Sequence, residues 1–386
     1  MRKICFFTGT RAEFGIMSGL MHAVSTSSDC QLQIVATNMH LSPEFGLTYR
    51  EIEASGLKID KKVEMLLSSE TANGTVKSMG LATIGFADAL EDLKPDLCVI
   101  LGDRFEMLAA AQAALVYKIP IAHIGGGDIT EGAYDDSIRH CITKMSHLHF
   151  TSTEESRKRI IQMGEQPEKV YWVGAPGLED NVKSQVMSKR ELEESLDFDL
   201  GDKFLLITFH PVTMENHTAE AQCRDLLKAV EDINEEYKLL FTLPNSDTDG
   251  RVIVSMINNF VEKNRERRFA ISSLGKKRYF AALRYTSAVI GNSSSGLVEA
   301  PSFHVPTLNI GDRQRGRVRG KSVLDVQANY VDIKHGLETI LSPVFRELVR
   351  KSTNPYEKEG TLEAIFEVIS SCSLDDLIPK KFYNCI

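Results

Sequence analysis

The chain has 386 residues, more than one hydrophobic core normally holds, so its length predicts two domains. Hydrophobic residues make up 42% and charged residues 25%, as in an ordinary globular protein, which excludes the disordered and fibrous classes. The formal net charge of −8 argues against a nucleic-acid partner, because Lys and Arg supply most of the affinity for phosphate backbones.

The cysteines and the N-terminus indicate the compartment. The cysteines are scattered and none forms a CxxC pair, which is typical of thiols in a reducing compartment. The apolar run at the N-terminus stops at Thr8, too short for a signal sequence. No stretch reaches the roughly 18 apolar residues that a membrane span needs. We therefore expect a cytoplasmic protein without a membrane partner.

Short apolar runs alternate with longer helical patterns in the first half of the chain. Such runs suit parallel strands that are buried on both faces of a sheet. They cover residues 4–8, 32–36, 97–101, 119–124, 148–151 and 170–173. Between the first two runs, Phe14, Met17, Met21 and Val24 follow helical spacing. This alternation predicts βαβ units and a doubly wound sheet.

The same alternation starts again after about residue 200. The apolar runs there cover residues 204–209, 239–243, 269–272, 288–290 and 306–310. Gly174, Pro176 and Gly177 break the chain between the two series. The predicted fold class is therefore α/β, with two doubly wound Rossmann-like domains facing a cleft. We place the first domain at residues 1–175, joined by a C-terminal helix at 360–386, and the second at 176–359.

Ligands of open α/β sheets bind beyond the carboxyl ends of the strands, so polar residues after each strand are candidates. Gly9-Thr10-Arg11 follows the first strand, and Arg11 at a helix start suits a phosphate. The alternative for this motif is an ordinary helix cap. Asp103 follows the third strand and is a candidate acid or base, or else an N-cap.

A glycine turn at residues 125–127 lies next to several acids. Asp128, Glu131, Asp135 and Asp136 crowd around this turn in the sequence. Crowded carboxylates repel one another, so one of them can hold a raised pKa and donate a proton. The alternative is a solvated acidic loop with Asp135 or Asp136 capping the next helix. The spacing matches no common ligand set, so no metal is expected.

The second half carries its own polar clusters. His210 follows a strand and is a candidate phosphate contact or general acid, although a lone histidine more often has a structural role. Asn245 lies in a polar turn before a helix. Ser293 and Ser294 open a helix directly after a strand, a pattern that favours a diphosphate. Glu299 follows one turn later, where it could bind a ribose diol.

Arginines follow the last apolar run of this series. Arg313, Arg315, Arg317 and Arg319 stand among glycines, which in an acidic chain indicates contact with an anion. The segment lacks the interleaved aromatic residues of a nucleic-acid site. The chain contains no GxxxxGK[ST], GxGxxG or GxSxG opening, which argues against a P-loop NTPase, an NAD enzyme and a serine hydrolase.

These motifs together resemble a known family. The chain resembles the hydrolysing UDP-N-acetylglucosamine 2-epimerases of bacterial sialic acid biosynthesis, and the epimerase half of the bifunctional animal enzyme. The resemblance covers nearly the whole chain. It is carried by Gly9-Thr10-Arg11-Ala12-Glu13, Gly102-Asp103-Arg104, Asp135-Asp136-Ser137-Ile138-Arg139-His140 with Thr143-Lys144, His210-Pro211-Val212-Thr213, Gly291-Asn292-Ser293-Ser294 and Arg313-Gln314.

The resemblance implies a glycosyltransferase-B-like fold, a UDP-amino sugar substrate and no cofactor. It also implies a homodimer or homotetramer. By motif match, the UDP contacts are His210, Asn245, Ser293, Ser294, Glu299 and Arg313, with Arg11 from the first domain. Asp103 and Asp135 match carboxylates with catalytic roles, and Asp128 and His210 are further catalytic candidates.

The implied reaction has two steps. A base removes the C2 proton while UDP leaves C1, which gives a 2-acetamidoglycal. Water then adds with C2 protonated from the opposite side, and N-acetylmannosamine and UDP result for nonulosonic acid biosynthesis. Two other activities stay open: a UDP-sugar glycosyltransferase of the same fold, and a nucleotide-sugar binding module without turnover.

One position departs from the family pattern. Many relatives read His-Ile-Glu-Gly-Gly-Glu, whereas this chain has Gly125 at the first acidic position and Asp128 at the second. Either Asp128 takes over a proton transfer, or the chemistry relies on Asp103 and Asp135. The change can also signal another sugar, UDP-2,4-diacetamido-2,4,6-trideoxyhexose of the legionaminic acid pathway.

Overall fold

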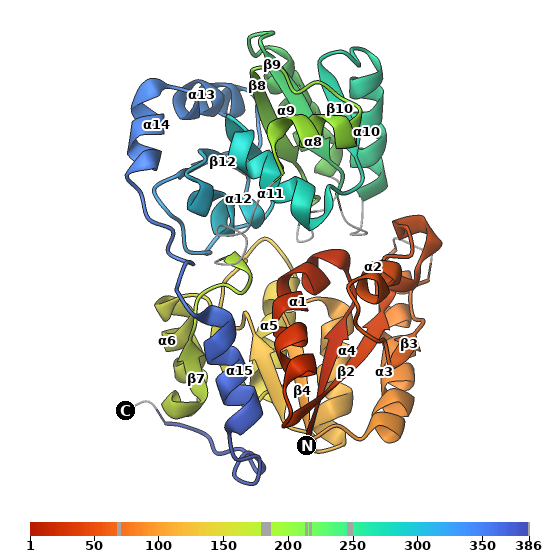
Figure 1. The fold of residues 1–386 in the computed structure, drawn as a ribbon. Coiled ribbons are helices and arrows are strands. Elements are labelled where there is room, and N and C mark those ends of the chain that lie inside the picture. The colour runs from red at the N-terminus through yellow and green to blue at the C-terminus, as the bar shows by residue number, and fades with distance from the viewer. Residues whose placement is uncertain (68–70, 179–186, 213–214, 216–217, 245–249, 385–386) are drawn as a thin grey trace. The chain divides into compact units, whose positions relative to one another are not determined.

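The computed structural model describes residues 1–67, 71–178, 187–212, 215, 218–244 and 250–384. The chain divides into two compact units (Figure 1). Unit 1 consists of Met1–Asp128, Asp135–Glu179 and Tyr356–Ile386. Unit 2 consists of Ile129–Tyr134 and Asp180–Pro355. Each unit is built around one parallel sheet, as the alternation of apolar runs and helical patterns predicts.

Unit 1 contains a sheet of seven strands in the order β3-β2-β1-β4-β5-β6-β7. The strands are β1 (Arg2–Thr8), β2 (Cys30–Thr37), β3 (Lys61–Val63), β4 (Leu97–Leu101), β5 (Ile121–Ile124), β6 (Leu148–Thr151) and β7 (Val170–Trp172). Every pairing is parallel, and β4 to β6 are buried along their whole length. The sequence did not predict β3, because Lys61 and Lys62 interrupt the apolar pattern of this short edge strand.

Helices cover both faces of this sheet (Figure 1). They are α1 (Arg11–Thr26), α2 (Tyr49–Ala54), α3 (Ala72–Leu93), α4 (Phe105–Val116), α5 (Asp135–Met145), α6 (Glu154–Gln162) and α15 (Thr361–Ser371). Helix α1 buries Phe14, Met17, Met21 and Val24, the stripe that the helical spacing predicts.

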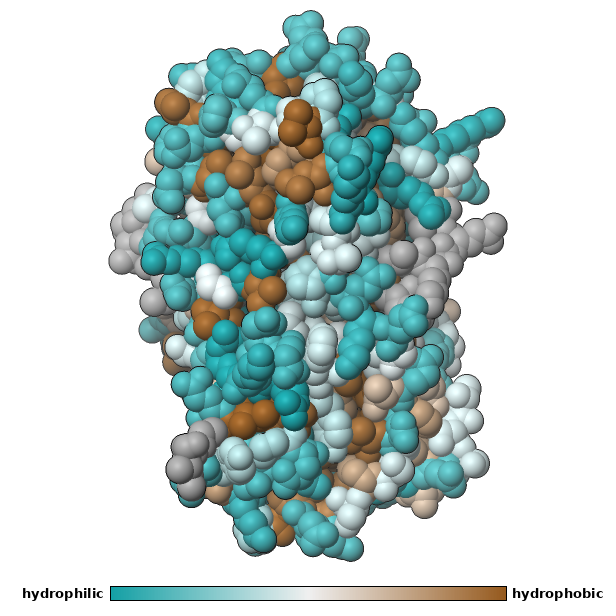
Figure 2. Space-filling model, turned by 90° about the vertical axis from the view of Figure 1, so that its left-hand side faces the viewer, coloured by the Kyte–Doolittle hydropathy of each residue, from teal (hydrophilic) through white to brown (hydrophobic). Residues whose placement is uncertain are grey.

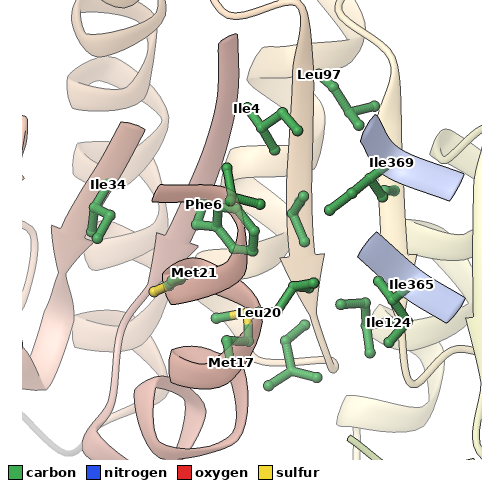
Figure 3. Close-up of a cluster of buried hydrophobic side chains, with 14 of the residues drawn as sticks. Ile4, Phe6, Met17, Leu20, Met21, Ile34, Leu97, Ile124, Ile365 and Ile369 are labelled. Atoms are coloured by element: carbon green, nitrogen blue, oxygen red, sulfur yellow. The ribbon is translucent and has the colours of Figure 1, made fainter. Parts of the chain in front are cut away.

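The last helix, α15, returns to the first sheet. Ile365 and Ile369 are fully buried in one apolar cluster with Ile4, Phe6 and Met17, as Figure 3 shows. Burying an isoleucine side chain contributes about 1.5–3 kcal/mol, so this contact is a substantial part of the core. The end of the chain and its beginning therefore share one hydrophobic core.

Beyond α15 the chain is held by the ammonium group of Lys380. Its Nζ donates to the backbone oxygens of Lys144 at 2.7 Å and Ser146 at 2.6 Å, and lies 2.7 Å from Glu165 Oε2. Glu165 also accepts from Lys144 at 2.6 Å and His149 at 3.0 Å. Burial raises the pKa of Glu165, but these hydrogen bonds lower it by more, so that the pKa falls to about 2. The ionised carboxylate thus anchors the C-terminal segment.

We expect Lys380→Met to lower the free energy of unfolding by about 1–3 kcal/mol, because it removes one donor of the buried Glu165 carboxylate and the ammonium group that the carbonyl groups of Lys144 and Ser146 accept from. Urea denaturation followed by circular dichroism measures the change. The neighbouring exposed Lys381→Met is the control and should stay within about 0.5 kcal/mol of wild type. Equal stability of both variants would contradict the anchoring role of Lys380.

Unit 2 contains a parallel sheet of six strands in the order β10-β9-β8-β11-β12-β13. The strands are β8 (Lys203–Thr208), β9 (Tyr237–Thr242), β10 (Arg268–Ile271), β11 (Ala288–Gly291), β12 (Thr307–Ile310) and β13 (Val323–Val326). The helices are α8 (Lys189–Leu196), α9 (Ala219–Glu231), α10 (Gly250–Glu262), α11 (Gly275–Tyr285), α12 (Ser295–Val298), α13 (Tyr330–Ile340) and α14 (Pro343–Arg350). The sequence did not predict β13, a half-exposed edge strand that contains Asp325.

Both sheets confirm the doubly wound α/β class, and each has a switch point where the strand order reverses. In unit 1 this point lies between β1 and β4, and in unit 2 between β8 and β11. The connections from the two adjoining strands run to opposite faces there, and ligands of such sheets bind beside it at the carboxyl ends of the strands. Residues that follow β1, β4, β8 and β11 therefore come first in the search for a site.

The surface carries no sign of a bilayer span in the part of the chain that the structure describes. No helix there combines the length and apolar composition needed to cross a membrane. The side of the molecule in Figure 2 is mostly hydrophilic, with apolar side chains gathered in its upper part. The exposed apolar residues of α13 and α14 are Val331, Val344 and Leu348.

Candidate functional site

His210 and Asn292 meet at the switch point of unit 2. The backbone N–H of His210 donates to Asn292 Oδ1 at 2.7 Å, and Asn292 Nδ2 donates to the carbonyl oxygen of His210 at 2.8 Å. Asn292 is fully buried. The preceding Gly291 has φ of +131°, and a Cβ there would lie 1.8 Å from Thr208 O. The ends of β8 and β11 therefore lie so close together that a side chain does not fit at position 291.

The backbone oxygen of Asn292 accepts hydrogen bonds from the arginine segment that follows β12. Arg313 Nη1 donates to Asn292 O at 3.2 Å, and Gln314 Nε2 donates to the same oxygen at 3.0 Å. The structure thereby brings Arg313 next to Ser293, as the sequence predicts for an anion site. A guanidinium beside hydroxyl groups suits a diphosphate. Asn292 lies in the family motif after β11, but it was not among the predicted site residues, because a motif does not show the tertiary partners of a buried asparagine.

Ser294, Ser295 and Glu299 lie in the segment after β11. The helix that follows Ser294 is α12, which spans only Ser295–Val298, so its dipole is much smaller than the sequence suggested. Burial raises the pKa of Glu299, while hydrogen bonds and Arg317 lower it by less. Glu299 Oε2 has no hydrogen-bond partner among the described residues. This oxygen is therefore available to a ligand hydroxyl.

Tyr279 is a further polar residue of this region that the sequence did not indicate. Its hydroxyl hydrogen-bonds to Ser295 Oγ, next to Glu299. An aromatic residue within a helical pattern normally indicates core packing, so nothing in α11 singles Tyr279 out. Asn245, which the sequence placed in this site, lies outside the described residues.

In unit 1 the carboxyl group of Glu13 binds the backbone N–H groups of the turn after β1. The N–H groups of Gly9 and Thr10 donate to Glu13 Oε2 at 2.7 Å and 3.0 Å, and Thr10 caps α1 in return. The sequence predicted a phosphate at this helix start and at Arg11, and it did not predict that Glu13 binds the N–H groups of the turn. Arg11 lies with its Nε 2.8 Å from Glu51 Oε2, in a partly exposed ion pair. The helix start thus has a structural cap, and phosphate contact by Arg11 stays a prediction.

Arg139 is the centre of an acidic cluster in unit 1. Its side chain is 1% exposed, and its Nη2 contacts the carboxylate of Asp103. Its Nη1 lies 3.3 Å from Asp136 Oδ1 and donates to Asp128 O at 2.9 Å. Burial lowers the pKa of Arg139, but the attraction of Asp103, Asp128 and Asp136 raises it on balance. A fixed positive charge therefore lies beside Asp103.

The other two predicted catalytic acids differ in their surroundings. Asp128 is 7% exposed, and its Oδ1 accepts from Ser156 Oγ at 2.6 Å and Ser152 Oγ at 3.3 Å. These hydroxyl groups tie the glycine turn to the start of α6. Asp135 is half-buried and begins α5, one residue before the Asp136 that pairs with Arg139. Asp136 belongs to the crowded acids named above, and Asp136 and Arg139 both lie in the family motif, but neither was among the predicted site residues.

His123 fixes the loop that carries Asp103. The ring is fully buried, with Nε2 2.8 Å from Gly102 O and Nδ1 3.1 Å from Thr143 Oγ1. Burial lowers the pKa of His123 to about 3, so the ring is neutral at neutral pH. A neutral ring that donates from Nε2 to the carbonyl accepts from Thr143 at Nδ1. His123 thereby orients the Gly102–Asp103 turn.

Gly125 follows His123 on the same strand end. It has φ of +81°, a conformation that favours glycine. A Cβ at Gly125 would have the backbone N of Gly102 as its only near neighbour, at 4.0 Å. The position therefore leaves open space beside the loop of Asp103.

The two groups of residues offer different chemistry. Unit 2 presents a guanidinium, hydroxyl groups and buried amides, which can hold a leaving diphosphate by electrostatic stabilisation. Unit 1 presents carboxylates around a fixed cation, which can transfer protons. Among the residues that the structure describes, no cluster of His, Cys, Asp and Glu is arranged to hold a metal ion.

Comparisons with known proteins identify relatives of this chain. The family model described as UDP-N-acetylglucosamine 2-epimerase matches residues 22–370. A GDP/UDP-N,N'-diacetylbacillosamine 2-epimerase (hydrolyzing) from Campylobacter jejuni subsp. jejuni serotype O:2 is 40% identical, covering 99% of both chains. A UDP-N,N'-diacetylbacillosamine 2-epimerase (hydrolyzing) from Legionella pneumophila is 34% identical with the same coverage. The crystal structure of UDP-GlcNAc 2-epimerase from Neisseria meningitidis bound to UDP-GlcNAc shares the fold, with a TM-score of 0.81, 19% identity and coverage of 96% of this chain and 99% of that chain.

Proposed function

The chain belongs to the UDP-N-acetylglucosamine 2-epimerase family, and from this premise we propose that it is a hydrolysing 2-epimerase. The observation that carries the proposal is the acidic cluster around Arg139. Inversion at C2 requires removal of a poorly acidic proton and its return from the other face, which positioned carboxylates can provide. Asp103 contacts the buried guanidinium directly, and Asp135 lies one residue from Asp136.

The substrate that we propose is UDP-N,N'-diacetylbacillosamine, a UDP-2,4-diacetamido-2,4,6-trideoxyhexose, in place of UDP-N-acetylglucosamine. The two relatives named for this sugar are 40% and 34% identical over 99% of the chain. A UDP-N-acetylglucosamine 2-epimerase of Neisseria meningitidis serogroup B is 30% identical over 84% of the chain. The open space at Gly125 is consistent with a larger group at C4 of the sugar.

We propose separate roles for the residues of the two units. A carboxylate of unit 1, for which we propose Asp103 or Asp135, removes the C2 proton as the bond from C1 to the UDP oxygen breaks. The leaving diphosphate is stabilised by Arg313, Ser293 and Ser294 of unit 2, while Glu299 binds the ribose hydroxyls. Water then adds its oxygen to C1 of the glycal, and an acid returns a proton to C2 from the opposite face. The products are UDP and the free sugar with inverted C2.

Incubation with the two UDP-sugars in deuterium oxide tests this proposal. We expect release of UDP and a reducing 2,4-diacetamido sugar that carries deuterium at C2, both visible by NMR. A GDP-linked sugar should be included, since the relative from Campylobacter is named for both nucleotides. If neither of the two UDP-sugars releases UDP, this result contradicts the proposal. Release only in the presence of an acceptor glycan would favour a glycosyltransferase.

We also propose a cytoplasmic homodimer or homotetramer. The family resemblance supports the assembly, and the free thiols of Cys5, Cys30, Cys98 and Cys223, all buried, suit a reducing compartment. Native mass spectrometry of the purified chain measures the number of subunits.

The hydrogen bonds of Asn292 lead to a prediction about UDP binding. We expect Asn292→Ala to weaken UDP binding about tenfold or more, equivalent to about 1.4 kcal/mol, because the backbone of His210, a proposed UDP contact, loses both hydrogen bonds to the Asn292 side chain. Isothermal titration calorimetry with UDP measures this loss. Asn329→Ala removes a helix cap elsewhere in unit 2 and is the matched control. Equal affinities of the two variants would remove Asn292 from the binding site.

A further inference from the structure

Two buried carboxyl groups border Gly9 at the switch point of unit 1. Glu13, on α1, is 7% exposed, and Glu106, on α4, is fully buried. Gly9 donates its N–H to Glu13 Oε2 at 2.7 Å, and a Cβ added at Gly9 would lie 2.3 Å from Glu106 Oε1. The two acids thus converge on one glycine that has no room for a side chain.

The charges around Gly9 do not balance when both acids are ionised. Arg104 lies with its Nε 2.9 Å from Glu106 Oε1, and the N–H groups of Gly9 and Thr10 face Glu13. Two carboxylates and one guanidinium leave a surplus negative charge in a buried place, which is costly. Moreover, Glu13 Oε1 and Glu106 Oε2 have no hydrogen-bond partner among the described residues. A single proton removes the surplus charge and supplies a donor.

The other groups that face this turn do not supply that proton. His40 donates its backbone N–H to Gly9 O at 3.2 Å, and burial lowers its pKa to about 4, so its ring is neutral at neutral pH. Arg11 pairs with Glu51. Burial and the charge of Glu106 raise the pKa of Glu13 to about 8, although Arg104 and the hydrogen bonds from Gly9 and Thr10 lower it.

We propose that Glu13 keeps its proton at neutral pH, and that Glu13 and Glu106 act together as positioning residues for the loops that carry Arg11 and Asp103. Glu13 closes the turn that leads into Arg11, and Glu106 holds Arg104, the residue after Asp103. Loss of the proton places two like charges at Gly9 and pushes the two loops apart. The inference rests on the proposed function only where it concerns turnover.

The pH dependence of unfolding tests the proton on Glu13 without any substrate. Between pH of about 4.5 and about 8 the folded chain binds a proton at Glu13 that the unfolded chain lacks, so wild-type stability falls as pH rises through this window. Glu13→Gln removes that proton. We expect the melting temperature of wild type, relative to Glu13→Gln, to fall by about 3 °C or more between about pH 5 and about pH 8.5.

Glu106→Gln provides a second measurement, because it removes the charge of Glu106 while burial still raises the pKa of Glu13. We expect it to weaken the same dependence on pH, and it decides the question alone should Glu13→Gln not fold. Glu53→Gln is the control, since Glu53 pairs with Lys62 at 3.0 Å in an exposed ion pair. It should keep the wild-type curve. Curves for Glu13→Gln and Glu106→Gln that run parallel to wild type would overturn the proposed proton on Glu13.

Turnover tests the positioning role. We expect kcat of wild type to fall between about pH 7 and about pH 9, and both variants to lose this fall. An unchanged pH profile of kcat in both variants would overturn the positioning role. Failure of wild type to convert either UDP-sugar would instead contradict the proposed function, and the unfolding curves would still report on the proton.

Discussion

Asp103→Asn is expected to lower kcat by about 10²–10⁴-fold, the range that a general acid or base contributes. The Kd for UDP should stay within about twofold of wild type, because the proposed nucleotide contacts His210, Ser293 and Arg313 lie in unit 2. Asparagine keeps the shape of the side chain and one oxygen for Arg139, but it cannot take up a proton. Steady-state kinetics and calorimetry with UDP measure the two quantities.

Asp136→Asn is the matched control for this experiment. Asp136 also pairs with Arg139, at 3.3 Å, so its variant reproduces the loss of one ion pair without touching Asp103. We expect a clearly smaller loss of kcat in Asp136→Asn, and for Asp135→Asn a loss of turnover that exceeds any loss of UDP binding. A near-normal kcat in Asp103→Asn, or equal losses in the Asp103 and Asp136 variants, would remove Asp103 from the proton transfer.

Arg139→Met is expected to lower the free energy of unfolding by about 3 kcal/mol, because it breaks a buried ion pair from one side. The value lies at the low end of the usual range, since the side chains of Asp103 and Asp136 are 24% and 25% exposed and keep some hydration. Turnover should fall as well, since Asp103 loses its fixed partner. Chemical denaturation followed by tryptophan fluorescence of Trp172 in unit 1 measures the stability change.

Arg190→Met is the control for the stability measurement. Arg190 is 88% exposed and pairs with Glu194 on the surface of α8, so its removal should change stability by less than about 0.5 kcal/mol. A similar small change in Arg139→Met would show that the acidic cluster is not held by this guanidinium.

Periodicity alone was sufficient to predict most of the architecture. A parallel strand that is buried on both faces has to be apolar along its length, so β1, β4, β5 and β8 are visible as unbroken runs. The edge strands β3 and β13 were not predicted from the sequence, because an edge strand is partly solvated and tolerates charged residues such as Lys62 and Asp325. The position of Asp103, His210 and Ser293 after strands follows from the same rule.

The sequence by itself determined the two doubly wound sheets, the family and the residues at the strand ends. Only the tertiary structure decided which charged side chains lie near one another. Arg139 lies 36 positions from Asp103, and Glu13 and Glu106 lie on different helices, so no local pattern links them. The positions of these side chains depend on where parallel strands place successive loops, and burial together with the charge of Glu106 then raises the pKa of Glu13. The change in pKa is an electrostatic effect that acts through space, whereas the strands and helices follow from hydrophobic periodicity along the chain.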